Sequence, residues 1–142
     1  MSKSAVAWIF AMTGVLVGAF AIQLMRRLSR QKEWPKTPGL VTSSAVDFLW
    51  ETYRANVQYR YAIDAEEYIG KTIRSWMLQY NWRGPATRLC GRFPVGSKVD
   101  VYVSPADKSY SVLEPGGDRP ALWLIGTASI VLILASVALA ID

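Results

Sequence analysis

Two long apolar runs enclose a more polar middle section. Residues 5–25 and residues 121–141 contain no charged side chain. At a rise of about 1.5 Å per residue, runs of this length cover the roughly 30 Å hydrocarbon core of a bilayer. The pattern therefore predicts two transmembrane helices, an N-terminal one within residues 1–25 and a C-terminal one within residues 117–142.

The first apolar run differs from a cleaved signal peptide. It is longer than the usual apolar region of about 7–15 residues, and it runs directly into Arg26 and Arg27 without a small-residue cleavage pattern. We therefore expect it to remain as an anchor.

Small residues recur on one face of the first run. Their spacing of four, three, four and three places Ala7, Ala11, Gly14, Gly18 and Ala21 in line along a helix. In lipid, small residues let helix backbones approach closely, so the stripe predicts a helix-packing face. The alternative is that glycine and alanine are simply frequent in membrane spans. The second run carries a weaker version of the stripe, made of Gly126, Ser129, Ser136 and Ala140.

Basic and aromatic residues flank the apolar runs. The cations beside the middle section are Arg26, Arg27, Arg30, Lys32, Lys36 and Arg119. Positively charged flanks stay in the cytoplasm, which predicts a protein of the inner, cytoplasmic membrane with a cytoplasmic middle section and both termini on the opposite side. Trp8 and Trp123 lie near the run ends and are expected at the membrane interface, together with Arg26, Arg27 and Arg30. These cations could also bind anionic headgroups, but we favour topology determination as their role.

Beyond a basic connector of residues 26–39, the hydrophobic period changes to two. Strands are predicted at 40–49, 53–63, 68–78, 98–103 and 109–115, with a hairpin turn at 64–67. Prolines and glycines interrupt residues 79–97, so we expect little regular structure there. The fold class is membrane α+β: an antiparallel β domain over residues 40–116, as a sheet or small barrel, flanked by two transmembrane helices.

Several segments of the middle section follow a known family pattern. They are "WPKTPGLV" (34–41), "VQYRYAI" (57–63), "YIGKTI" (68–73), "FPVGSKVDVYVSPAD" (93–107) and "SVLEPG" (111–116). In their order they resemble the bacterial membrane-protein family called domain of unknown function 3592. The chain departs from the family pattern at Phe93, at Val103 and in the "DAEE" turn. The resemblance implies a small β domain on membrane helices and no catalytic set.

The composition excludes several kinds of chemistry. The chain has no histidine and one cysteine, Cys90, so it lacks Ser-His-Asp and Cys-His machinery and most zinc or haem sites. It also has no GxxxxGK[ST] or GxGxxG phosphate-binding loop. We therefore predict no catalytic residue, no cofactor and no metal.

Three carboxylates in residues 93–116 are the remaining candidates for catalysis. Asp100 is in phase with Lys98 and opposite to the valines, Asp107 lies in a turn sequence, and Glu114 precedes Pro115. Each has an ordinary structural role on a strand face or in a turn. We interpret all three as structural.

Aromatic and basic residues alternate within residues 73–92. Trp76, Tyr80, Trp82 and Arg83 are typical anchors of a protein interface. Single-stranded nucleic acid could also stack there. However, the chain has 16 basic and 11 acidic residues, and all of them except Lys3 and Asp142 lie in the middle section. This section therefore has only a mild excess of positive charge, which does not favour binding of nucleic acid.

These patterns together predict a non-catalytic accessory subunit of a larger membrane complex, such as a photosynthetic or respiratory one. Its helices would dock against other subunits within the lipid bilayer, and its β domain would cap the cytoplasmic face. The alternative is a free-standing, membrane-anchored regulator or sensor whose β domain binds a lipid headgroup or a small ligand. A polar pocket in the domain would favour that alternative.

Overall fold

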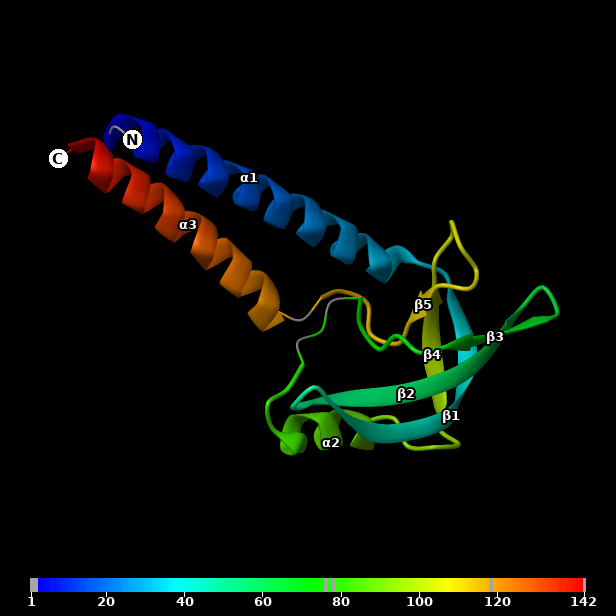
Figure 1. Cartoon of the computed structure of the whole chain (residues 1–142). Coiled ribbons are helices and arrows are strands. Elements are labelled where there is room, and N and C mark those ends of the chain that lie inside the picture. Colours follow the sequence, from blue (N-terminus) through cyan, green and yellow to red (C-terminus); the bar gives the residue numbers. More distant parts are fainter. Residues whose placement is uncertain (1–2, 76, 78, 118, 142) are drawn as a thin grey trace. The chain divides into compact units, whose positions relative to one another are not determined.

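The computed structural model describes residues 3–75, 77, 79–117 and 119–141. The chain divides into two compact units. One is a pair of long helices, and the other, called the β unit below, is formed by Leu28–Gly116 (Figure 1).

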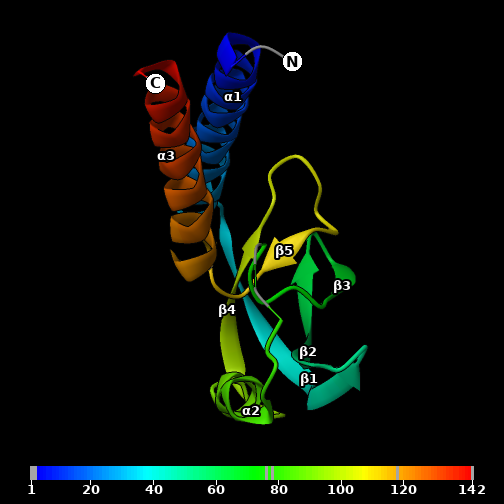
Figure 2. The same cartoon turned by 60° about the vertical axis from the view of Figure 1, so that its left-hand side comes forward.

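The β unit is built on an antiparallel sheet of five strands in the order β3-β2-β1-β4-β5. The strands are β1 (Lys36–Leu49), β2 (Thr52–Ile63), β3 (Glu66–Gly70), β4 (Lys98–Val103) and β5 (Ser111–Val112). A short 3-10 helix, η1 (Gln31–Glu33), precedes the sheet, and α2 (Arg83–Gly91) packs against β1 and β2 (Figure 2).

Backbone hydrogen bonds join the two edges of the sheet beyond the regular strands. The N–H groups of Leu113 and Glu114, which follow β5, donate to the carbonyl oxygen of Ile73, which follows β3, at 3.2 and 2.8 Å. The sheet therefore curls toward a small barrel, one of the two forms that alternation predicted.

The interior of the β unit is formed by alternate residues of the strands. Its buried members are Val41, Ala55, Val57, Tyr59, Tyr61, Ile73, Leu89, Val101, Val103 and Leu113. The Tyr59 hydroxyl group is hydrogen-bonded to the carbonyl oxygens of Thr72 and Ser111 at 2.9 and 3.0 Å. One side chain therefore connects β2 to both edges of the curled sheet. Burial accordingly raises the pKa of the Tyr59 phenol, since a buried phenolate would lose its hydration.

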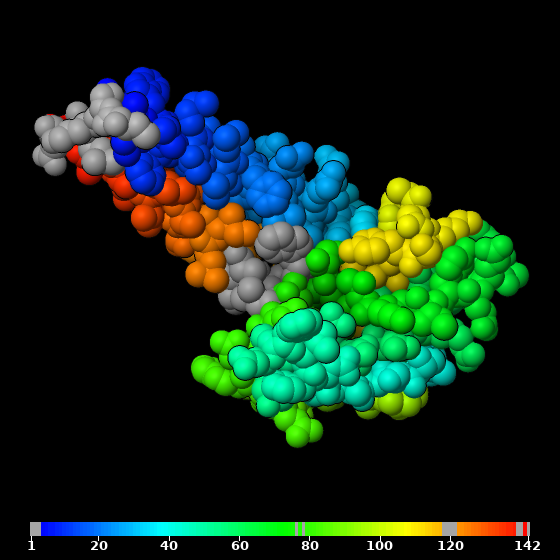
Figure 3. Space-filling model, viewed as in Figure 1, coloured from blue at the N-terminus to red at the C-terminus, as the bar shows by residue number. Residues whose placement is uncertain are grey.

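The helix pair consists of α1 (Lys3–Arg30) and α3 (Arg119–Ile141). They run antiparallel, side by side in both ribbon views and in contact in the space-filling view (Figures 1 to 3). The Ser129 hydroxyl group donates a hydrogen bond of 2.9 Å to the carbonyl oxygen of Gly14. A Cβ atom at Gly14 would lie 2.8 Å from Cγ1 of Ile133, so only glycine permits this approach.

Among the described residues, one helical segment, Ser4–Glu33, is long and apolar enough to cross a membrane. A signal sequence near the N-terminus would also meet this criterion of length and composition. The apolar segment of α3, Leu122–Ala138, is shorter. The structure therefore supports one possible span rather than the two that the sequence predicted.

Several predicted boundaries differ from the observed ones. The first helix continues beyond residue 25 to Arg30, and β1 begins at Lys36, so most of the predicted connector of residues 26–39 is regular structure. The predicted strand 68–78 ends at Gly70, and the final strand 109–115 shrinks to Ser111–Val112. Residues 79–97 contain the helix α2, whereas the sequence predicted little regular structure there. The helix can form despite Pro85 because this residue lies in its first turn, where proline is tolerated.

Candidate functional site

The small-residue stripe of α1 faces α3 of the same chain. Ala7 and Ala21 are 7% and 4% exposed, Gly14 is also buried, and Ala11 and Gly18 are half-buried. A Cβ atom at Gly18 would lie 2.9 Å from Oγ of Ser129. The stripe is thus in contact with an intramolecular partner, whereas the sequence prediction placed a foreign subunit there.

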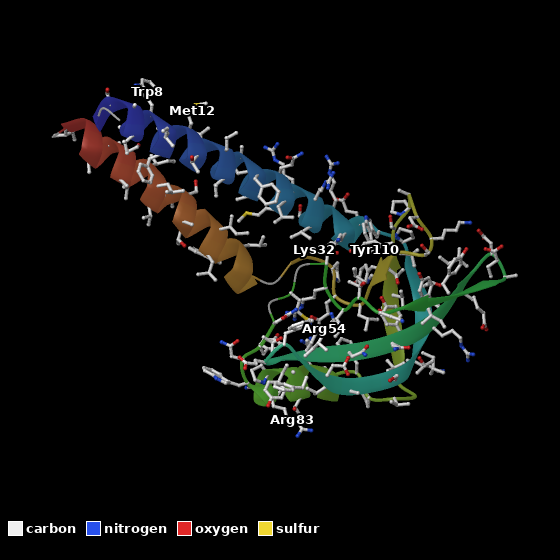
Figure 4. The ribbon with its side chains drawn as sticks, in the orientation of Figure 1. Trp8, Met12, Lys32, Arg54, Arg83 and Tyr110 are labelled. Carbon is white, nitrogen blue, oxygen red and sulfur yellow. The ribbon has the colours of Figure 1, made fainter. Side chains whose placement is uncertain are left out.

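The outer faces of both helices remain apolar. On α1, Trp8 and Met12 are 71% and 61% exposed and point away from α3 (Figure 4). On α3, Trp123 and Leu134 are 74% and 62% exposed. Arg26, Arg27 and Arg30 are exposed near the C-terminal end of α1. Apolar outer faces of this kind are unusual in a water-soluble helix, whose outer face is polar.

The three acids of residues 93–116 have different surroundings. Asp100 is exposed on β4. Oδ1 of Asp107 accepts hydrogen bonds from the backbone N–H and the hydroxyl group of Ser109 at 2.9 and 2.6 Å. These two bonds lower the pKa of the Asp107 carboxyl group, because they favour its charged form. The role of Asp107 is therefore to close the turn before β5.

Glu114, the third of these acids, forms ion pairs with two arginines. Its side chain is 19% exposed and lies between the guanidinium groups of Arg74 and Arg92. The Arg92 contact measures 2.5 Å, and Arg74 approaches through both Nε and Nη2. The arrangement joins the end of β5, the segment after β3 and the end of α2. Sequence reasoning missed it because the three residues are far apart in the chain.

An aromatic surface forms at the hairpin between β1 and β2. Phe48, Leu49 and Trp50 are 61%, 62% and 89% exposed. The backbone N–H of Tyr53 donates to the Tyr80 carbonyl oxygen at 2.7 Å, and the reverse bond measures 3.1 Å, so the segment that leads to Trp82 lies beside the hairpin. We call Phe48, Leu49, Trp50, Trp82 and Arg83 the aromatic surface.

The predicted interface residues are partly brought together by this arrangement. Tyr80 is half-buried against Tyr53, Trp82 is 76% exposed, and Arg83 is exposed at the start of α2, pointing away from the sheet (Figure 4). Trp76 lies outside the described residues. The tip residues Phe48–Trp50 were missed, although "FLWE" between two alternating segments was a visible signal of an apolar turn.

The hairpin turn that carries Trp50 has an unusual sequence. Trp50 and Glu51 both have positive φ, 51° and 58°, as in the type I′ turns that normally use Asn-Gly. Bulky residues cost roughly 1 kcal/mol or more in this conformation, and such residues cluster at functional positions. The strained turn places the Trp50 side chain at the exposed tip of the hairpin.

A polar cavity of about 480 Å³ opens on the outer face of β2, beside the segment that follows β3. Its polar lining includes Arg54, Asn56, Gln58, Lys71, Arg74 and Ser75. A second cavity of about 390 Å³ lies beside β1 and β4 and contains the ion pair of Lys108 with Asp64, at 2.6 Å.

The described residues contain no group of three or more histidine, cysteine, aspartate or glutamate side chains placed to hold a metal ion. Cys90 is half-buried in α2, and its thiol group lies 3.1 Å from the carbonyl oxygen of Ala45. The thiol therefore contributes to the packing of α2 on β1.

Comparison with known families gives a match to the β unit. Residues 37–118 match the model of a domain of unknown function, DUF3592. The chain belongs to this family. The DUF3592 match begins at the second residue of β1 and extends past Gly116, so it includes α2 and every strand residue except Lys36. No curated protein matches the chain.

Proposed function

We propose that the protein is a non-catalytic accessory subunit of a larger membrane complex. Its helix pair anchors it in the bilayer, and its aromatic surface binds another subunit. The single observation that carries the proposal is the aromatic surface, with Trp50 almost fully exposed on a strained turn. Tryptophan and arginine are enriched among the residues that dominate binding energy at protein interfaces.

Docking through the β unit is better supported than docking through the helices. Because the small-residue stripe of α1 is occupied by Ser129 and Ile133 of α3, it needs no foreign helix. Exposed apolar residues at the hairpin tip have no such intramolecular cover among the described residues. A partner that buries Phe48 and Trp50 removes this apolar area from water, which favours association.

Two spans and a cytoplasmic β unit belong to the proposal. The full α3 has 23 residues, about 34 Å at 1.5 Å per residue, and its outer face is apolar. Basic residues concentrate on the segment between the helices. A cysteine placed at Trp82, in a Cys90→Ser background, should react with an impermeant maleimide only after the membrane is opened. Reaction in intact cells would disprove this orientation.

Docking is tested by purification of the full chain in a mild detergent. The wild type should retain a membrane-protein partner in stoichiometric amounts, for which photosynthetic and respiratory complexes are the expected hosts. The variant Trp50→Ser/Trp82→Ser should retain at least about tenfold less, because hot-spot residues contribute roughly 2 kcal/mol or more each. The positions are exposed, so the fold should persist.

A matched control removes two exposed apolar residues elsewhere on the β unit. Ile69 and Val95 are 65% and 63% exposed, and Ile69→Ser/Val95→Ser should retain the partner as the wild type does. Equal retention by the tryptophan variant, or no stoichiometric partner at all, would refute docking through the aromatic surface.

One observation favours the alternative function, a membrane-anchored regulator whose β unit binds a headgroup or a small ligand. That observation is the polar cavity on β2. A volume of this size lies within the range of ligand sites.

A further inference from the structure

The cavity on β2 is bordered by cations from two separate segments. Arg54 projects from the outer face of β2, while Lys71 and Arg74 come from the segment after β3 (Figure 4). Its described lining contains no aspartate or glutamate. The polar surface is therefore rich in hydrogen-bond donors and positive charge.

Two of these cations are not neutralised. Among the described residues, the side chains of Arg54 and Lys71 form no hydrogen bond and no ion pair. Asp47, which lies opposite Arg54 in the β1–β2 register, accepts a hydrogen bond of 2.8 Å from the Asn56 amide instead. In the cavity beside β1 and β4, by contrast, Lys108 is paired with Asp64.

The remaining wall of the cavity is held in position by the fold. Arg74 is fixed at the wall by Glu114. Oγ of Ser75 accepts a hydrogen bond of 2.5 Å from the Gln31 amide and lies 2.8 Å from the Tyr110 hydroxyl group. A ligand would therefore find part of its site already ordered, which lowers the entropic cost of binding.

We propose that this cavity binds an anion that carries a phosphate group, with Arg54 and Lys71 as its charged ligands. Arginine matches the geometry of phosphate oxygens through paired N–H donors, and lysine binds them as a point charge. A volume of about 480 Å³ accepts a phosphate ester with part of its organic substituent. The anion is either the headgroup of an acidic phospholipid or a soluble phosphate ester. This inference deepens the regulator alternative and does not depend on docking through the aromatic surface.

The test uses the full chain in a neutral detergent, in two arms. In the first, glycerol phosphate and inorganic phosphate are titrated and binding is measured by calorimetry. In the second, the chain is equilibrated with phosphatidylglycerol or with phosphatidylcholine, and native mass spectrometry counts the retained lipids. Wild-type binding should be present in at least one arm, with phosphatidylglycerol retained over phosphatidylcholine in the second.

The variant Arg54→Gln/Lys71→Gln should lose at least about tenfold in affinity in the arm where binding occurs, because it removes both charged donors. The matched control Arg88→Gln/Lys98→Gln removes one exposed arginine and one exposed lysine outside the cavity, and should change affinity less than about twofold. A loss restricted to the first arm identifies a soluble phosphate ester, and a loss restricted to the second identifies a headgroup. Absence of binding in both arms, or equal losses in the two variants, would overturn the proposal. Docking would be unaffected by that result, because it is measured on Trp50 and Trp82.

Discussion

Gly14 of α1 and Gly70 of β3 both occupy places where no side chain fits, but they serve interiors of opposite kinds. Beside Gly14 lie Ile133 and the small polar side chain of Ser129, and the two helix backbones approach because side chains are missing. Beside Gly70 lies the ring of Tyr59, which fills the space that a Cβ atom would need. The helix pair packs closely because side-chain atoms are absent at Gly14, whereas the β unit packs around the large ring of Tyr59.

The surroundings proposed for the two units, lipid for the helix pair and water for the β unit, account for this difference. In lipid, apolar side chains gain little by leaving the tails, so close backbone contact and hydrogen bonds such as Ser129 to Gly14 stabilise a helix pair. In water, burial of a large ring is strongly favourable, and its hydroxyl group must then find partners. Tyr59 finds them in Thr72 and Ser111, which belong to the two edges of the sheet. The structural role of a glycine therefore depends on the residue that packs against it, which is Ile133 for Gly14 and Tyr59 for Gly70.

The largest effect is expected from loss of the ring in the β unit. Tyr59→Ala should lower the free energy of unfolding by about 3–5 kcal/mol, because it leaves a cavity beside Gly70 and removes the bonds that join both edges. Urea unfolding of the detergent-solubilised chain, followed by near-ultraviolet circular dichroism, would measure the loss.

A second substitution at the same position separates packing from hydrogen bonding. Tyr59→Phe keeps the ring and removes only the hydroxyl group, so it should cost about 1–3 kcal/mol. If Tyr59→Phe and Tyr59→Ala were equally destabilised, the ring would contribute nothing beyond its hydroxyl group, and the contrast with the helix pair would fail.

A smaller effect is expected from adding atoms to the helix pair. Gly14→Leu should force α1 and α3 apart at Ile133, at a cost of roughly 1–3 kcal/mol in that contact, while insertion into the membrane stays normal. Solution NMR in detergent micelles should show a nuclear Overhauser effect between Ile133 and Gly14 in the wild type, and the corresponding contact should be absent from the variant.

Leu16 is the control for this substitution. It is 66% exposed on the outer face of α1, so Leu16→Ile should leave the contact of Ile133 with Gly14 intact. Persistence of the helix contact in Gly14→Leu would mean that the stripe only reflects composition. The β unit should unfold at the wild-type urea concentration in both variants, because Gly14 and Leu16 lie outside it.

Local pattern predicted the parts of the fold that depend on neighbours in the chain. Alternation from Tyr53 to Ile63 and from Lys98 to Val103 located β2 and β4. The turn at Asp64 and Ala65 located β3, the hairpin partner of β2. Helix α2 was missed because Gly84 and Pro85 were interpreted as breakers, whereas both lie in its first turn. Glycine and proline occur both in loops and in the first turn of a helix. The sequence alone does not distinguish these two positions, whereas the tertiary contacts do.

The candidate sites were less predictable than the fold. The spacing of Gly14 and Gly18 indicated a packing face, but periodicity along one helix contains no information about which helix covers it. Arg54 belongs to β2 and Lys71 to the segment after β3, and the two share a cavity only because that segment turns beside β2. The partners of Glu114 are similarly distant in sequence.

The amide of Gln31 has a consequence for how such a chain can be assembled. Its nitrogen donates to Ser75, and its oxygen accepts a hydrogen bond of 3.1 Å from the backbone N–H of Gly116. The β unit therefore begins and ends at one point, within the reach of a single side chain. It has the form of an insert: cut out between Gln31 and Gly116, it would leave two helices that a short turn could rejoin, and grafted elsewhere it would need only a narrow gap between two helix ends. An architecture of this kind lets the helix pair and the β unit be exchanged independently.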